Sequence, residues 1–259
     1  MQIETEGLVI REGSVGESDR LVTLLTKDEG VLRAFARRAK TVRSAQNSGT
    51  QLLCYSEFSI FKGREKYSIN EARPKEIFFG LREDIGRLAL AQYFCELSGL
   101  LAPEGSPAGE YLRLVLNSLH FLSKNLRPEP LLKAVTEMRM LAFSGYMPDL
   151  VCCAECACYE ADVMWFLPDD GILLCGDCYR PDGRRAIPLG RGVLTGLRHT
   201  IYAEFSKLFA FQLPPEALTQ LAAASEAFLL SHIDRPLPTL SFYHTLLPCP
   251  GFHPPFPPW

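Results

Sequence analysis

Two closely spaced pairs of cysteines constrain this chain more than any other feature of its sequence. Each pair has two residues between its cysteines, and 18 residues separate the pairs, which are formed by Cys153, Cys156, Cys175 and Cys178. A turn of this kind points two thiolates toward one ion, so two turns supply the four sulfur ligands of a tetrahedral zinc site. Four thiolates leave no open position for water, which favours a structural over a catalytic ion. We therefore expect a structural Zn²⁺ in a zinc-ribbon-like element at about residues 150–180.

The sequence around these cysteines leaves some alternatives open. Apolar runs at 163–167 and 171–174 flank a Pro-Asp-Asp turn and predict a hairpin between the pairs. Cys152 and Cys158 lie close to the first pair, and Cys152 with Cys156 would form a C-x3-C pair. Cys153 is preferred because its spacing matches that of the second pair. A site of reduced cysteines that has lost its metal and an iron–sulfur cluster are the other interpretations, although common cluster spacings differ.

The start of the chain bears on how the cysteines are used. Residues 1–6 are acidic and no apolar segment follows a basic one, so no signal peptide is indicated. No uninterrupted apolar run approaches the length of a membrane span. We therefore expect a cytoplasmic protein, in which clustered cysteines are more often metal ligands than disulfides.

The first 80 residues predict a small closed β-barrel. Short runs rich in β-branched and aliphatic residues are separated by turn residues, and they cover 7–10, 20–26, 31–36, 57–61 and 66–72. Five short strands with no segment of helical length among them are typical of a small barrel.

From about Asp84 the spacing of apolar residues becomes helical. Helices are predicted at 85–100, at 111–122, from Pro128 or Pro130 to Gly145, at 187–208 and at 215–232. The predicted fold class is thus multidomain α+β, with a barrel domain at 1–80 and an all-α domain at 81–247 that contains the cysteine element. Residues 248–259 hold six prolines in twelve positions, and we expect a disordered tail there.

Positive charge is concentrated in the predicted barrel. The net charge of the chain is −3, yet residues 1–80 carry a net +2, and positions 30–56 hold no acidic residue. The cations of this stretch are Arg33, Arg37, Arg38, Lys40 and Arg43, and they lie in or beside a polar loop at 41–50. Cations on such a loop suit salt-sensitive contacts with phosphates. The sequence therefore predicts a DNA-binding surface here, the alternative being an ordinary solvated face.

Further residues extend this candidate surface. Lys62, Arg64 and Lys66 are additional cations, and candidate platforms for base stacking are Phe35, Tyr55, Phe58 and Tyr67. Aromatic residues of a barrel are more often part of its core, so the two interpretations stay open. A second basic stretch follows the cysteine element at Arg180, Arg184, Arg185, Arg191 and Arg198. That stretch either lengthens a binding surface or solvates a linker.

The sequence contains no pattern that indicates catalysis. Gly190-Arg191-Gly192 lacks the lysine of a phosphate-binding loop, and the five histidines are scattered without ligand spacing. We therefore expect a protein that is not an enzyme.

Three segments, taken in order, resemble the RecO family of bacterial recombination mediators. They are 15–26, the basic segment 37–44, and 141–150, which runs directly into the first cysteine pair. The resemblance implies an N-terminal OB-fold, a helical domain and an embedded zinc-binding element. It also implies binding of single- and double-stranded DNA, annealing of complementary strands, and help in loading recombinase onto strands coated by single-stranded-DNA-binding protein (SSB). The implied partners are RecR, the SSB C-terminal tail and possibly RecF, and the implied location is the cytoplasm, at the nucleoid.

Two other functions compete with a DNA-binding mediator. One is a zinc-ribbon adaptor whose acidic helical domain docks protein partners without touching DNA. The other is a metalloenzyme, which would require an open coordination position on the metal.

Overall fold

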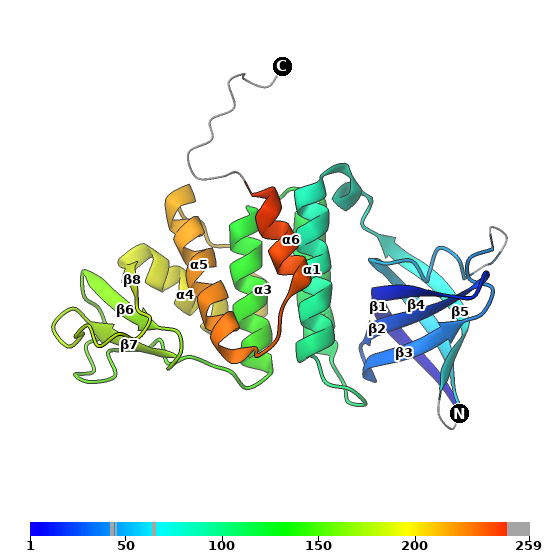
Figure 1. Cartoon of the computed structure of the whole chain (residues 1–259), viewed down its shortest axis with the longest axis horizontal. Helices are drawn as coiled ribbons and strands as arrows, with labels where there is room; N and C mark the ends of the chain where they lie inside the picture. The colour runs from blue at the N-terminus through cyan, green and yellow to red at the C-terminus, as the bar shows by residue number, and fades with distance from the viewer. Residues whose placement is uncertain (42–43, 45, 64–65, 248–259) are drawn as a thin grey trace, which may run out of the picture.

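The structure is a computed structural model that describes residues 1–41, 44, 46–63 and 66–247. The expected tail at 248–259 and two of the candidate DNA-binding residues, Arg43 and Arg64, lie outside the described residues. The molecule has three parts in a row, as Figure 1 shows: a β-barrel, a group of helices and a small three-stranded sheet. The barrel and the small sheet lie at opposite ends, with the helices between them. No helix among the described residues is long and apolar enough to cross a membrane.

The N-terminal strands form the closed barrel that the sequence predicts, and the structure gives their order as β1-β2-β3-β5-β4. The strands are β1 (Gln2–Val15), β2 (Asp19–Thr26), β3 (Gly30–Ala36), β4 (Cys54–Lys62) and β5 (Tyr67–Ile77). Neighbours pair antiparallel except β3 and β5, which close the barrel in parallel. Alternate residues point inward, because side chains alternate between the faces of a strand, and Val9, Val22 and Leu24 are examples of the buried interior.

One outer row of the barrel packs against the helices. Leu8, Leu25 and Val31 are paired across β1, β2 and β3 and are buried in the same core as the helical residues. Beyond this row the register of β1 shifts between Val9 and Arg11. The next outward row is polar, so the contact with the helices ends there.

Backbone hydrogen bonds fasten the turn between β2 and β3 to the segment that follows α1 (Ile85–Leu101). The N–H of Val31 donates to the carbonyl of Pro103 at 2.8 Å, and the N–H of Gly105 donates to the carbonyl of Glu29 at 3.0 Å. Gly30 has a φ of +67°, and a Cβ there would lie 2.1 Å from the Pro103 carbonyl oxygen. Only glycine fits this close approach, so the barrel is held to the helices by a tight joint.

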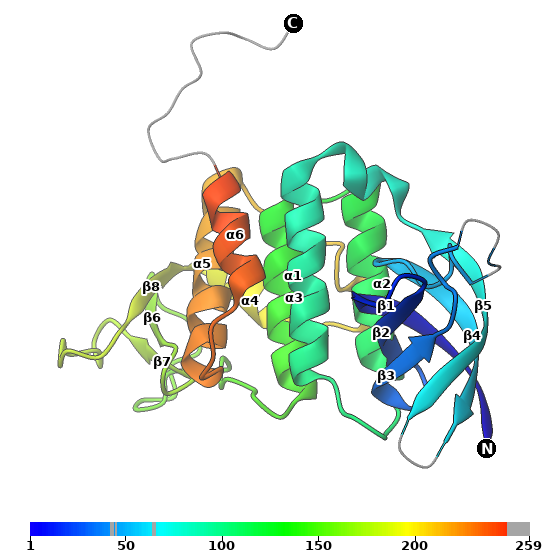
Figure 2. The same cartoon turned by 45° about the vertical axis from the view of Figure 1, so that its right-hand side comes forward.

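The helices surround α3 (Glu129–Phe143), which lies at the centre of the bundle (Figure 1). The others are α1, α2 (Gly109–Ser123), α4 (Arg191–Tyr202), α5 (Pro215–His232) and α6 (Pro238–Leu246), with short 3₁₀ turns at Phe79–Glu83 and Phe205–Lys207. Figure 2 shows α2 on the side of the barrel, where it contacts β1 and β2.

A buried ionic network joins four of these helices. Lys133 of α3 is 3% exposed, and its Nζ lies 2.7 Å from carboxylate oxygens of both Glu137 and Glu226. Glu137 is fully buried and also accepts hydrogen bonds from the hydroxyls of Tyr93 on α1 and Ser225 on α5. The network extends to α6 through His244, whose Nε2 lies 2.9 Å from Glu226.

The small sheet has the order β7-β6-β8 and corrects one sequence prediction. The strands β6 (Val163–Leu167) and β7 (Ile172–Cys175) form the predicted hairpin. Residues 187–190, which the helical prediction for 187–208 included, form the edge strand β8 (Ile187–Gly190), and α4 begins only at Arg191. Pro188 explains the difference, because proline lacks a backbone donor and is tolerated at the edge of a sheet but not inside a helix.

Candidate metal centre and nucleic-acid interface

The four predicted ligand residues come together at one end of the small sheet. The sulfur atoms of Cys153, Cys156, Cys175 and Cys178 all lie within 4.8 Å of one another. The Sγ atoms of Cys156 and Cys175 are 3.6 Å apart. A tetrahedral shell with zinc–sulfur bonds of about 2.3 Å places its sulfurs about 3.8 Å apart, so the spacing suits one zinc ion. The arrangement is a four-cysteine cluster that can hold a metal ion.

Backbone contacts between the two turns position the cluster. Cys153 forms a bridge with Leu173 of β7, and the N–H of Ala154 donates to the Leu173 carbonyl at 2.8 Å. Cys175 is the last residue of β7, and the N–H of Cys178 donates to its carbonyl at 3.1 Å. The residue with a left-handed backbone in these turns is Ala157, with a φ of +59°. Each cysteine pair is thus fixed by the hairpin.

The pKa values of the clustered thiols are shifted in opposite directions by their mutual contacts. Burial raises the pKa of Cys153, but the backbone N–H groups of Cys156, Cys175 and Glu155 outweigh it and lower the pKa to about 6. The pKa of Cys178 is raised, chiefly because its thiol shares hydrogen bonds with Cys156 and Cys175. One sulfur therefore ionises readily while another keeps its proton, and a metal cation would have to displace that proton.

The other two cysteines of this region lie outside the cluster. Cys152 is half-buried and is not one of the four clustered residues. The Sγ of Cys158 donates to the carbonyl of Glu160 at 3.1 Å, and its own carbonyl accepts the N–H of Cys153 at 2.8 Å. Cys158 thus supports the first turn through its backbone.

Most arginines of the second basic stretch pair with other groups of the protein. Arg184 pairs with Asp170 and Asp182, Arg185 with Asp169, and Arg191 with Asp162, at 2.6–3.1 Å. Arg198 donates to the carbonyls of Leu150, Val151 and Tyr159. Arg180 contacts only the carbonyl of its neighbour Tyr179 among the described residues. Four of the five arginines are thus engaged with other groups of the protein, so the stretch does not offer a row of free cations.

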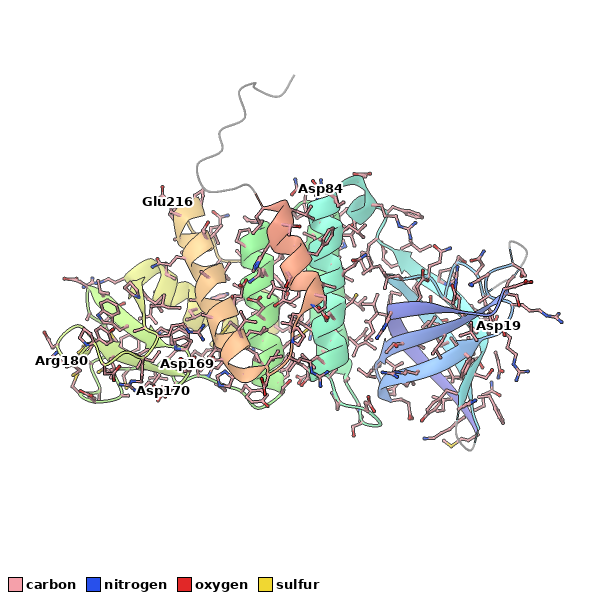
Figure 3. All side chains as sticks on the ribbon, viewed as in Figure 1. Asp19, Asp84, Asp169, Asp170, Arg180 and Glu216 are labelled. Atoms are coloured by element: carbon pink, nitrogen blue, oxygen red, sulfur yellow. The ribbon has the colours of Figure 1, made fainter. Side chains whose placement is uncertain are left out.

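The first basic segment folds against the turn between β1 and β2. Arg37 and Arg38 are exposed, and the N–H of Arg38 donates to Asp19 Oδ1 at 2.7 Å. Lys40 is half-buried, and its Nζ contacts the carbonyl of Gly16 at 3.3 Å. These contacts use mainly backbone groups of the segment, so Arg37 and Arg38 stay exposed at the end of the barrel where Asp19 lies. Asp19 is labelled in Figure 3.

Two pairs of cations and aromatic rings lie beside the contact between β3 and β5, on opposite faces of the barrel wall. The Nζ of Lys66 lies 5.6 Å from the ring centroid of Phe35, and the Nζ of Lys62 lies 5.5 Å from that of Tyr67. Both rings are half-buried. Phe35 lies between the inward-facing Ala34 and Ala36 and so points to the outer face, whereas Tyr67 is paired with Ala34 and packs against the interior of the barrel. Phe35 is therefore available for stacking, and Tyr67 belongs to the edge of the barrel core.

The remaining predicted platforms have other roles. Phe58 is 1% exposed and belongs to the interior of the barrel, so the stacking interpretation is wrong for this residue. The hydroxyl of Tyr55 donates to Glu6 at 2.6 Å, and the Lys75 Nζ lies 5.6 Å from its ring centroid. Tyr55 is thus tied into an ion pair on a different side of the barrel.

Arg33 lies on the outer face of β3, away from the basic segment. It is paired across the sheet with Thr23, which is paired in turn with Arg11 of β1. These three residues line a groove between the barrel and α1. The sequence did not predict Arg11 as a site residue. The side chain of Arg11 points outward because of the register shift in β1, and no sequence pattern predicts that shift.

The outer face formed by β1, β4 and β5 carries the opposite charge. Its carboxylates are Glu4, Glu6, Glu57, Glu71 and Glu76. The cations among them are paired, with Lys75 2.6 Å from Glu6 and 3.3 Å from Glu57, and Arg73 2.8 Å from Glu71. Phosphates are repelled by this side of the barrel, so the charges distinguish one face from the other.

The fold and these two candidate sites define a multidomain α+β protein with an N-terminal barrel, a helical domain and a four-cysteine element. Comparisons with known proteins match this organisation. Residues 1–78 match the family described as Recombination protein O N terminal, whose fold is the OB-fold, and residues 82–241 match Recombination protein O C terminal. The chain belongs to the RecO family of DNA repair proteins.

Curated relatives agree with this assignment over most of the chain. The DNA repair protein RecO of Acetivibrio thermocellus is 33% identical over 244 residues, which cover 94% of this chain and 97% of that protein. The proteins of the same name from Alkaliphilus metalliredigens and Symbiobacterium thermophilum are 31% and 32% identical, over 91% and 93% of this chain and 95% and 96% of the relatives.

Proposed function

We propose that this protein is a recombination mediator of DNA repair that binds single- and double-stranded DNA directly and anneals complementary strands. It would then help load recombinase onto SSB-coated single strands. The proposal needs no chemical turnover, so the protein would not be an enzyme. Neutralised phosphates repel one another less, and two strands held on one protein meet at a raised local concentration.

The observation that carries the proposal is the unequal charge of the barrel. Exposed Arg37 and Arg38 lie at one end of β3, and the ring of Phe35 lies on its outer face with the Lys66 ammonium 5.6 Å from the ring centroid. The face formed by β1, β4 and β5 is acidic. Cations beside open aromatic rings suit single strands, which offer both phosphates and unstacked bases. In OB-folds, oligonucleotides bind on the β2–β3 face, between the loops after β1 and β4.

We propose that the four-cysteine element holds a structural Zn²⁺. All four donors are thiolates in reach of one ion, and this donor set leaves no place for a reacting water. The metal would join the turn at Cys153 to the end of β7 and keep the small sheet folded. The barrel at 1–80 and the helical domain at 81–247 are proposed as its two domains.

The proposed partners follow from the family. They are RecR, the SSB C-terminal tail and possibly RecF, together with DNA in the cytoplasm, at the nucleoid. The names of the relatives support DNA repair, and the partners themselves rest on the family resemblance.

Annealing of two complementary labelled oligonucleotides tests the proposal. The variant Arg37→Ala/Arg38→Ala removes two cations from the basic end of the barrel. Arg73→Ala/Lys75→Ala removes two from the acidic face and is the matched control. We expect the first variant to lose most of the acceleration that the wild type gives, and the control to keep it. Equal annealing rates for both variants, or no acceleration by the wild type, would contradict the proposal and favour an adaptor that does not touch DNA.

A further inference from the structure

A groove of about 620 Å³ separates the barrel from the helices. One wall is the outer face of β1, β2 and β3, and the other is formed by α1 and by the segment that leads into α6. We propose that this groove continues the path of bound single-stranded DNA, with Arg11, Arg33 and Arg235 contacting its phosphates. The inference rests on the proposed function and extends it from the barrel to the helical domain.

The order of side chains on the barrel leads from the stacking platform into the groove. Leu21 and Phe35 are paired on one row of the outer face, and Arg11, Thr23 and Arg33 form the next row toward the helices. Adjacent rows on one face are two residues apart, which is about 7 Å along a strand. This distance is close to the spacing of phosphates in extended single-stranded DNA. A DNA strand whose base stacks on Phe35 therefore brings its next phosphate to Arg33.

The three guanidinium groups of the groove are free to bind an anion. Arg11, Arg33 and Arg235 are exposed, and none makes an ion pair or a side-chain hydrogen bond within the described part of the chain. Arg235 comes from the segment between α5 and α6, so it faces the barrel arginines from the helical side. Guanidinium groups match the geometry of phosphate oxygens and contact them in pairs of hydrogen bonds.

Three carboxylates also line the groove, and two of them accept hydrogen bonds from other parts of the protein. Glu96 accepts the N–H of Thr239 at 3.2 Å and also its hydroxyl, at the start of α6. Glu12 accepts the N–H of Leu52 at 3.1 Å and lies 4.0 Å from Arg20. Glu104 is exposed at the rim and has no ion pair among the described residues. Hydrogen bonds from neutral groups do not cancel the charge of a carboxylate, so only Glu12, which lies beside Arg20, is compensated. Three arginines then face the carboxylates of Glu96 and Glu104, which leaves the groove a net charge of +1 among the described residues.

The groove is formed before any ligand arrives. The joint at Gly30 holds the barrel to the segment after α1, and the apolar row of Leu8, Leu25 and Val31 packs beneath it. Apolar side chains that include Leu100 and Leu237 line it between the charges. They offer the faces of bases a surface that water would otherwise cover. A preformed site loses little conformational entropy on binding.

The test compares two lengths of fluorescent oligothymidylate, about 6 and about 25 nucleotides, the shorter being a length that one OB-fold accommodates. The variant is Arg11→Ala/Arg235→Ala, and Arg180→Ala is a control for the loss of a free arginine. Arg180 lies at the far end of the molecule from the barrel (Figure 3). For the long oligonucleotide we expect affinity to fall roughly tenfold and the slope of log K against log salt to fall by about 1.4, which is 0.7 per phosphate. The short oligonucleotide should bind the variant as it binds the wild type.

Several outcomes would overturn the inference. If the groove variant binds the long oligonucleotide with the salt slope of the wild type, the arginines do not contact its phosphates. If the variant loses equal affinity for both lengths, the arginines belong to the primary site on the barrel rather than to an extension of it. If the groove variant loses binding to a synthetic acidic peptide but still binds DNA like the wild type, the groove is a peptide-binding site. If Arg37→Ala/Arg38→Ala weakens binding and the groove variant does not, only this inference fails. If the wild type binds neither length, the proposed function fails. Removing one opposing charge with Glu104→Gln should tighten binding of the long oligonucleotide about twofold.

Discussion

Replacing Lys133 by methionine should destabilise the helical domain strongly, because it leaves a carboxylate buried without its counter-ion. Lys133 Nζ lies 2.7 Å from both Glu137 and Glu226, and Glu137 has no exposure to solvent. Removing one partner of such a buried pair costs about 3–5 kcal/mol. The hydroxyls of Tyr93 and Ser225 still donate to Glu137, so we expect Lys133→Met to cost about 3 kcal/mol, at the lower end of that range.

A second substitution separates lost charge pairing from lost packing. Glu137→Gln keeps the shape of the side chain and an acceptor for Tyr93, but it has no charge to leave unpaired. The double variant Lys133→Met/Glu137→Gln should therefore be more stable than Lys133→Met alone, with a coupling of about 2 kcal/mol. Urea unfolding followed by circular dichroism on all four proteins of this cycle gives the coupling. A double variant no more stable than Lys133→Met would refute the argument from charge.

The same variant should depend on pH in a defined direction. Burial raises the pKa of Glu137 above that of the unfolded chain, and the Lys133 ammonium opposes this shift. In Lys133→Met the opposition is lost and the folded-state pKa rises further. A raised carboxyl pKa gives stability that is present below the unfolded pKa and is lost as pH rises through the folded pKa. The cost of the substitution should therefore be smaller at pH 5 than at pH 8, and a cost that does not change with pH would contradict it.

Three further predictions concern the metal, the joint and the stacking platform. Cys156→Ser should lower zinc affinity more than Cys152→Ser, and wild-type affinity should fall as pH falls because protons compete for the thiolates; zinc release to a chromogenic chelator measures both. Gly30→Ala should lower the unfolding free energy by about 3 kcal/mol, since its Cβ meets a carbonyl oxygen, whereas Gly105→Ala, with the same φ of +67° and open space, should cost about 1 kcal/mol in thermal unfolding. Phe35→Leu should weaken binding of single strands by about 1–3 kcal/mol and leave duplex binding unchanged in anisotropy titrations.

The sequence predicts those features that repeat with a regular spacing. Alternation of apolar residues predicts the five strands of the barrel, and two equal cysteine spacings predict which sulfurs gather at one point. Both signals are local, because each is contained in a short stretch of the chain. The sequence wrongly predicts a helix at the edge strand β8, because the helical spacing of apolar residues in α4 continues into the short segment before it.

Features that depend on distant contacts were not predictable in this way. Lys133 and Glu137 are four residues apart on a helix, a spacing typical of solvent-exposed ion pairs, and only the packing of α1 and α5 buries them. Arg184 and Arg185 resemble a free basic patch until the hairpin brings Asp169 and Asp170 to them. The direction of Arg11 follows from a shift in strand register.

If the basic end of the barrel binds DNA through phosphates, the affinity must depend steeply on salt. A fluorescent single-stranded oligonucleotide is titrated with the wild type and with the variant in which Arg37, Arg38, Lys40 and Arg43 are alanine, at about 50 and 200 mM salt. We expect tight, salt-sensitive binding by the wild type, and in the variant a slope of log K against log salt that is smaller by about 2.8, for four lost phosphate contacts. Equal slopes for the two proteins, or no binding by the wild type at low salt, would contradict it.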